Sequence, residues 1–108
     1  MLNHEEIEQI AKEFNLKLDE FDFPELKKIY LLEGKNTLFE FKYSEGFWVV
    51  VDRVIGFDQD IGCVRIYFNL IGRECSYEDC IEGCRNYIKQ KKAYLEQKKL
   101  DAIKEDFV

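Results

Sequence analysis

The stretch from Thr37 to Ile55 constrains the fold most, because it holds two segments rich in β-formers separated by only three residues. In the first segment, which ends at Tyr43, apolar and polar side chains alternate as they do in a strand with one face on a core. The connection Ser44-Glu45-Gly46 contains a glycine and is short enough for a β-hairpin. The stretch therefore predicts two neighbouring antiparallel strands, at residues 37–43 and 47–55.

We expect Tyr43 to lie opposite Phe47 across this hairpin. This pairing places Phe39 and Phe41 on one face of the sheet and Trp48 on the other. Because side chains alternate between the two faces along a strand, a shift of register by one residue would exchange those faces. The sequence thus predicts a core face and a second, uncovered face that carries Trp48.

Two further strands are expected, at Ile29–Glu33 and Cys63–Ile71, and Gly56–Gly62 is the longest connection between strands. Before them, the acidic and aromatic segment 19–25 alternates charges with phenylalanines and includes Pro24. A proline in such a mixture is typical of a loop, and we expect the rings of this loop to turn inward. The short connections between the four strands favour an antiparallel meander.

A helix is expected at each end of the strands. Asn3 is a good N-cap, and Glu6 follows three residues later, as in a capping box. Ser76 and Asp79 repeat this spacing, and no helix breaker follows them. A helix from Tyr77 to Asp106 would be about 45 Å long at about 1.5 Å per residue. A compact domain of this size has a radius of gyration of about 13 Å, so we expect residues from about 90 to 108 to form a charged helical extension.

The order α-β-β-β-β-α predicts one α+β domain over residues 1–108, a four-stranded antiparallel meander with both helices packed on one face. No apolar run approaches the roughly 18 residues that a membrane-spanning helix needs. The segment that begins at Met1 is acidic and lacks the apolar stretch of a signal peptide. We therefore expect a cytoplasmic protein with no membrane contact.

The charge is unevenly distributed. The net charge is −6, but residues 1–84 carry nine Lys and Arg against 18 Asp and Glu, whereas residues 85–108 carry seven against four. An acidic body repels phosphate backbones, so direct nucleic-acid binding is not expected and attraction to a basic protein surface is. The competing feature is a basic flank of the last helix, at Arg85, Lys89, Lys92 and Lys99, which is also typical of a solvated helix face.

The inventory of catalytic side chains is small. The chain has one histidine, His4, two serines and one threonine, and it lacks a glycine-rich phosphate loop and a His-Glu-x-x-His pair. We therefore predict no catalytic residues and no cofactor. The four cysteines are spaced without the paired knuckles of zinc sites. Buried thiols are the favoured interpretation, and a zinc site or a disulfide are the alternatives, for Cys63, Cys75, Cys80 and Cys84.

The candidate partner-binding residues form two groups. The first comprises carboxylates expected in exposed loops, where they could meet a basic partner. The Asp-x-Asp pair of the second loop lacks the further ligands of a calcium loop. The second group lies on the uncovered sheet face, where Trp, Tyr and Arg are typical interface hot spots, unless Trp48 and Tyr67 merely shield the sheet. The loop group is Asp19, Glu20, Asp22, Asp58 and Asp60, and the face group is Trp48, Asp52, Arg65 and Tyr67.

In architecture, an acidic one-domain chain with a helix, antiparallel strands, a helix and acidic loops resembles small phage-encoded inhibitors of bacterial defence, among them anti-CRISPR proteins. The resemblance implies a non-catalytic inhibitor that mimics nucleic acid and occupies a basic site of a larger protein, such as a nucleic-acid enzyme. It transfers no role to any single residue. The alternatives are a structural or dimerising accessory protein that uses the long last helix in a homodimer, and a small metal-binding or enzymatic domain.

Overall fold

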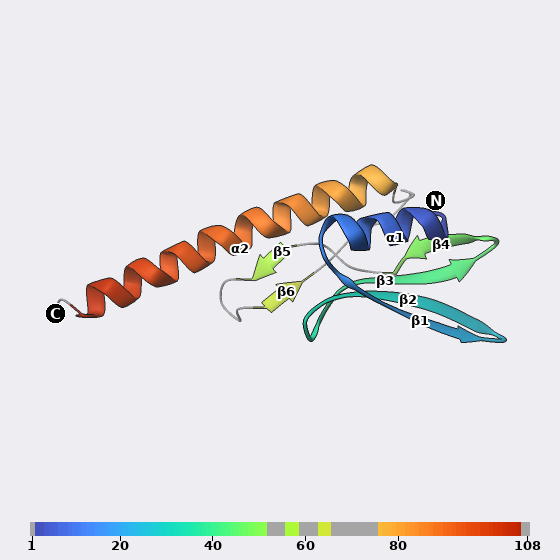
Figure 1. The fold of residues 1–108 in the computed structure, drawn as a ribbon, viewed down its shortest axis with the longest axis horizontal. Coiled ribbons are helices and arrows are strands. Elements are labelled where there is room, and N and C mark those ends of the chain that lie inside the picture. The colour runs from blue at the N-terminus through green and yellow to red at the C-terminus, as the bar shows by residue number, and fades with distance from the viewer. Residues whose placement is uncertain (1, 52–55, 59–62, 66–75, 107–108) are drawn as a thin grey trace.

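The computed structural model describes residues 2–51, 56–58, 63–65 and 76–106. The α+β prediction is confirmed: four strands form one antiparallel sheet in chain order, a meander, and a helix lies before and after it (Figure 1). The elements are α1 (His4–Glu13), β1 (Lys17–Phe23), β2 (Leu26–Glu33), β3 (Asn36–Ser44), β4 (Phe47–Val50), β5 (Gly56–Asp58), β6 (Cys63–Arg65) and α2 (Tyr77–Asp106).

The strands of the sheet are not all those predicted. The segment expected as an acidic loop forms β1, which pairs with β2 from Lys17 opposite Leu32 to Phe23 opposite Leu26. Pro24 lies in the two-residue turn between them, where a missing N–H costs no ladder hydrogen bond. The rings of β1 do not turn inward, since Phe21 and Phe23 are 45% and 55% exposed.

The predicted fourth strand also differs. Its first three residues form β6, which pairs with β5 in a separate two-stranded sheet. Residues 66–71 of that prediction lie outside the described residues. The described part of the third predicted strand, β4, ends at Val50. The four strands of the main sheet therefore come from the first half of the chain.

The register of β4 is shifted by one residue from the predicted one. Ser44 pairs with Phe47, and Tyr43 pairs with Trp48. The turn contains two residues rather than three, and both Glu45 and Gly46 have positive φ, 53° and 83°. This is the backbone geometry of tight hairpin turns, whose twist matches that of the strands.

The new register moves Trp48 to the core face. Its side chain is 5% exposed and packs in the same cluster as Phe39, Phe41 and Val50. The prediction that Trp48 lies on an uncovered face is therefore wrong. In this position it cannot serve as an exposed contact for a partner.

A β-bulge interrupts the alternation of β3. Leu31 pairs with Phe39, whereas Leu32 pairs with Thr37, so Leu38 is an extra residue in β3. A bulge bends its strand and breaks the two-residue period. As a result Leu38 and Phe39, neighbours in sequence, are both buried.

The first helix is fixed at its start. Glu6 N donates to Asn3 Oδ1 at 2.8 Å, and Asn3 N donates to Glu6 Oε1 at 3.1 Å, which confirms the predicted capping box. Leu2, one residue earlier, is fully buried and exchanges two backbone hydrogen bonds with Trp48, of 3.2 and 3.0 Å. The buried face of α1, with Ile7 and Ile10, is thereby held over the sheet.

The second helix has the predicted bounds and the predicted cap. Ser76 N donates to Asp79 Oδ2 at 3.0 Å, and Asp79 N donates to Ser76 Oγ at 3.2 Å. Cys80 and Cys84 are buried thiols, in agreement with the favoured interpretation for these two residues. The Cys63 side chain and Cys75 lie outside the described residues.

The middle of α2 is tied to the sheet, and its end is not. The Tyr87 hydroxyl donates to Glu33 Oε1 at 2.9 Å, and Lys91 forms an ion pair with the same carboxylate. Phe57 of β5 packs against Tyr94, with ring centroids 4.8 Å apart. Beyond this point α2 projects from the body, and the molecule is 60 Å long with a radius of gyration of 16.2 Å. Among the described residues, neither helix is apolar enough over a sufficient length to cross a membrane.

Replacing Trp48 by alanine is expected to lower the free energy of unfolding by about 3–5 kcal/mol, the range for buried aromatic residues. The same replacement at Phe47, whose side chain is 44% exposed, should cost about 1 kcal/mol or less. Urea denaturation followed by circular dichroism measures both variants. A larger loss for Phe47→Ala than for Trp48→Ala would contradict the shifted register.

The Cys84 thiol is expected to resist alkylation in the folded protein. Burial, with a further contribution from Glu13, raises its pKa to about 12, and only the thiolate reacts. Because the folded state keeps this proton to a higher pH, the stability that Cys84 contributes should be present below about pH 9 and lost as the pH rises toward 12. Peptide mapping after iodoacetamide treatment at pH 8, with and without urea, tests this; equal rates would refute it.

Candidate protein-binding surface

One face of the main sheet carries no helix among the described residues. Both helices lie on the same side of the sheet in Figure 1, and the opposite side is open. Directly paired residues share a face, so the register assigns Phe21, Lys28, Lys42 and Val49 to the open side as one cross-strand row. We call this side the outer face.

Large apolar side chains gather at one end of the sheet. The β1–β2 and β3–β4 turns lie at the same end, because strands of a meander alternate in direction (Figure 1). Five of the nine exposed large hydrophobic residues in the described part of the chain are here, each 39–55% exposed. We call this group the hairpin-end cluster, and it consists of Phe21, Phe23, Leu26, Tyr43 and Phe47. The register places Tyr43 on the helix side of the sheet, beside Trp48, and the other four on the outer face.

Charged residues border the hairpin-end cluster. Asp22, Glu25 and Glu45 are exposed beside the two turns, and Asp22 lies 3.8 Å from Lys27 with both side chains largely in water. Lys27 also lies over the ring of Tyr43, 5.5 Å from its centroid. Lys42 is also exposed, on the outer face next to the β3–β4 turn, so the cluster has an apolar centre and a rim of mixed charge.

The middle of the outer face differs from the hairpin end, because its polar side chains form hydrogen bonds with one another. Lys28 Nζ donates to Glu40 Oε1 at 3.1 Å, and the Tyr30 hydroxyl donates to the same oxygen at 3.4 Å. The Glu40 side chain is only 13% exposed. Phe21 meets the Tyr30 ring edge-on at 5.4 Å between centroids. Exposed apolar surface is therefore concentrated at the hairpin end.

The candidate acidic residues of the first predicted loop lie in a strand instead. Asp19, Glu20 and Asp22 lie on β1 and alternate between its two faces. Asp19 is 3.7 Å from Lys17, and Glu20 contacts His4. Only Asp22 borders the hairpin-end cluster, so the predicted acidic loop is replaced by a charged edge strand.

Of the other predicted residues, the side chains of Trp48 and Asp58 are described, and neither residue lies in β1. Asp58 ends β5, which packs on α2. The Arg65 backbone pairs with Gly56 at the end of β6. The Arg65 side chain and all of Asp52, Asp60 and Tyr67 lie outside the described residues.

Sequence reasoning missed the phenylalanines of the hairpin-end cluster. Phe21 and Phe23 were assigned to a loop because Pro24 and the charges around it suggested one. The available signal was the position of Pro24-Glu25, a two-residue pair between segments of seven and eight residues that are long enough to be strands. Phe47 was assigned to the core by the wrong register.

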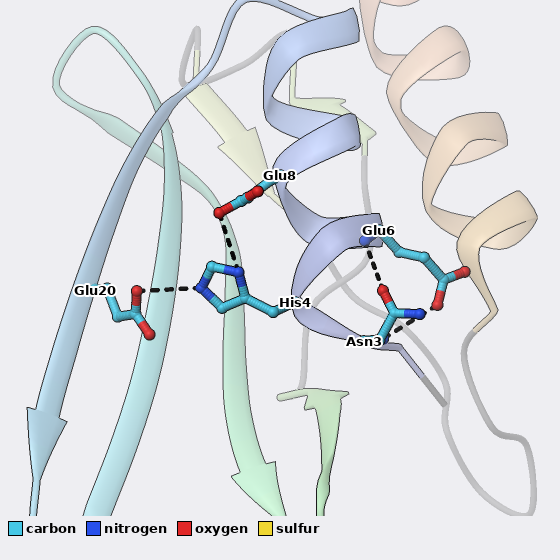
Figure 2. A network of polar contacts seen from close by, with 5 residues as sticks. All are labelled: Asn3, His4, Glu6, Glu8 and Glu20. Carbon is cyan, nitrogen blue, oxygen red and sulfur yellow. Dashed lines mark hydrogen bonds and ion pairs between the residues drawn. The ribbon is translucent and has the colours of Figure 1, made fainter.

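A histidine connects the first helix to the edge strand. His4 lies between two carboxylates, with Nδ1 3.1 Å from Glu8 Oε1 and Nε2 3.2 Å from Glu20 Oε2 (Figure 2). Glu8 is one turn further along α1, and Glu20 is on β1. The described part of the chain has no group of three or more His, Cys, Asp or Glu side chains placed to hold a metal ion. The imidazole is therefore best explained as a link between α1 and β1.

A hollow of about 660 Å³ lies beside α1, and the described residues that line it include no Ser, Thr, Cys or His. It is bordered by surface side chains of α1 and the start of β1, such as Glu5, Lys12 and Leu18. The hairpin-end cluster is the stronger candidate site.

A second charged feature lies where α1 meets the start of α2. The Tyr77 hydroxyl donates to Glu13 Oε2 at 3.3 Å. The pKa of Tyr77 is raised, first by loss of solvent and then by the charges of Glu13, Glu78 and Glu6. Arg85, 3.9 Å from Glu13, offsets part of this charge. Carboxylates from both helices thus form an acidic surface around Tyr77.

The chain matches no family model, no curated protein and no solved structure.

Asn3→Ala is expected to lower the free energy of unfolding by about 1 kcal/mol, because it removes the N-cap of α1. His4→Ala should cost about 0.5 kcal/mol or less, since its two ion pairs are 40–58% exposed and exposed pairs stabilise little. Chemical denaturation of the two variants gives the comparison. A larger loss for His4→Ala would mean that the imidazole is more than a surface link.

Proposed function

We propose that this protein is a non-catalytic protein-binding module that docks its hairpin-end cluster on a larger protein. The exposure of five large apolar side chains at one end of the sheet carries the proposal. Four of these side chains share the outer face, and a concentration of exposed apolar side chains is typical of interaction sites. Covering an aromatic or leucine side chain fully contributes about 1.5–3 kcal/mol, so a few half-exposed rings suffice for specific binding.

The charge of the molecule indicates the chemistry of the partner. The chain carries −6, and Asp22, Glu25 and Glu45 border the cluster. A partner with an apolar pocket and Lys or Arg on its rim would complement both features. Complementary rim charges mainly raise the association rate and make binding sensitive to salt.

An inhibitor is the form of this function that we favour. A small acidic module seated on the basic site of a nucleic-acid enzyme would exclude nucleic acid from it. The acidic surface around Tyr77 supports such competition, because it adds negative charge that does not belong to the docking cluster. The anti-CRISPR-like role implied by the resemblance is one case of this proposal.

The test is capture of a binding protein from bacterial lysate, followed by affinity measurement with that protein purified. Phe23→Ala/Phe47→Ala should weaken binding about 30- to 1,000-fold, because each hot spot contributes about 1–2 kcal/mol. The matched control, Leu100→Ala/Ile103→Ala, changes two equally exposed residues of α2 and should bind normally. Binding that tolerates the Phe23/Phe47 change, or is lost equally in the control, would contradict the proposal.

A homodimer through α2 is the second candidate. It is favoured by Leu95, Leu100 and Ile103, which are about half exposed on the part of α2 that projects from the body. Light scattering should give the monomer mass of 12.9 kDa if the first proposal holds alone. A dimer that reverts to monomer in Leu100→Glu/Ile103→Glu would support the second candidate.

A further inference from the structure

The two edge strands of the main sheet differ in length and in backbone pairing. At one edge, β4 has only four residues, and Leu2 pairs with Trp48 of that strand through backbone bonds of 3.2 and 3.0 Å. At the other edge, β1 has seven residues and pairs only with β2 among the described strands (Figure 1). On an edge strand, every second residue directs its N–H and C=O away from the sheet. The β1 edge is therefore open to a further strand.

The β1 edge is also regular. Its seven pairs with β2 run from Lys17 to Phe23 without a register shift, whereas β2 and β3 are interrupted by the bulge. A regular edge of this length presents evenly spaced backbone groups, which an extended segment can follow. Addition of a strand to such an edge is a recurrent mode of peptide recognition.

The side chains of β1 oppose pairing with a second copy. In an antiparallel pair that keeps the helices of both copies on one side, three registers join five or more residues of β1. They are centred on Asp19, Glu20 or Phe21, and they place Asp19 opposite Asp19, Glu20 opposite Glu20, or Glu20 opposite Asp22. Like charges directly opposite destabilise a sheet. The carboxylates thus disfavour self-pairing and favour a strand with positive charges.

We propose that the open edge of β1 binds an extended basic segment of the partner protein as a fifth strand. In this segment, Lys or Arg residues lie opposite Glu20 and Asp22 on the helix side of the sheet. Apolar residues alternate with them and lie opposite Phe21 and Phe23 on the outer face. The inference rests on the proposed function and adds the mode of binding to it.

The contacts that Glu20 and Asp22 already make leave both carboxylates accessible to a basic partner strand. Asp22 is 3.8 Å from Lys27, and their side chains are 68% and 48% exposed. The Glu20 carboxylate contacts the His4 ring, and both side chains are 40% exposed. Exposed ion pairs of this kind are weak and are readily exchanged. An incoming lysine can therefore approach either carboxylate without first disrupting a buried contact.

The test uses the full chain and a capped peptide, Lys-Val-Lys-Val-Lys-Val-Lys, with Glu-Val-Glu-Val-Glu-Val-Glu as its control. The lysine peptide should slow amide exchange at least tenfold at alternate residues of β1, and the glutamate peptide should not. A lysine peptide with N-methyl groups on alternate residues, which blocks its pairing edge, should lose this protection. Protection that persists with the methylated peptide, or that appears elsewhere instead, would overturn the inference.

A charge-reversal variant provides the second arm. Glu20→Lys/Asp22→Lys should bind the glutamate peptide and lose the lysine peptide, and circular dichroism would show that it remains folded. If the variant still binds the lysine peptide better than the glutamate peptide, the proposal of a fifth strand is contradicted. If β1 is not protected while Phe23→Ala/Phe47→Ala still abolishes partner binding, the strand mode is wrong and the proposed function stands. Protection of β1 with partner binding unaffected by Phe23→Ala/Phe47→Ala would instead contradict the hairpin-end cluster.

Discussion

The two-residue turn between β3 and β4 determines which residues form the core. Because Glu45 and Gly46 both adopt positive φ, Ser44 pairs with Phe47, and Trp48 is carried to the side of Phe39 and Phe41. Only in that position can Trp48 exchange backbone hydrogen bonds with Leu2. Those bonds fix the residue before α1, so the placement of the first helix over the sheet depends on a turn more than 40 residues away in sequence.

The features that the sequence predicts correctly are local. Asn3 with Glu6, and Ser76 with Asp79, determine where the helices start, because a capping box involves only residues three apart. The bounds of α2 follow from the absence of a helix breaker. The alternation in β3 also indicates a strand without reference to the rest of the chain.

The features that the sequence predicts wrongly depend on how the strands pair with one another. A turn of two residues and a turn of three look alike in Ser44-Glu45-Gly46, but they give opposite faces to Trp48. The charges of β1 suggest a loop unless β2 is already known to lie beside it. As a consequence, the predicted carboxylates Asp19, Glu20 and Asp22 lie in a strand rather than a loop, and Phe21, Phe23 and Phe47 were missed as candidate contacts.

The distribution of apolar and charged groups separates the molecule into two parts. Among the described residues, the hairpin end has exposed rings and no helix over its outer face, whereas contacts of Phe57, Tyr87 and Tyr94 join α2 to the rest of the body. Stability and the proposed binding therefore depend on largely different residues. Substitutions in the exposed rings can change recognition without removing the core.

The projecting end of α2 affects how the molecule moves in solution. With extents of 60 × 27 × 22 Å, the particle is more than twice as long as it is wide, so it diffuses more slowly than a sphere of equal mass. It would leave a sizing column early, at a position that spherical standards assign to a heavier protein. Its rotation is also anisotropic, and a dye placed near the end of α2 would report tumbling about the short axes at a distance from the hairpin end.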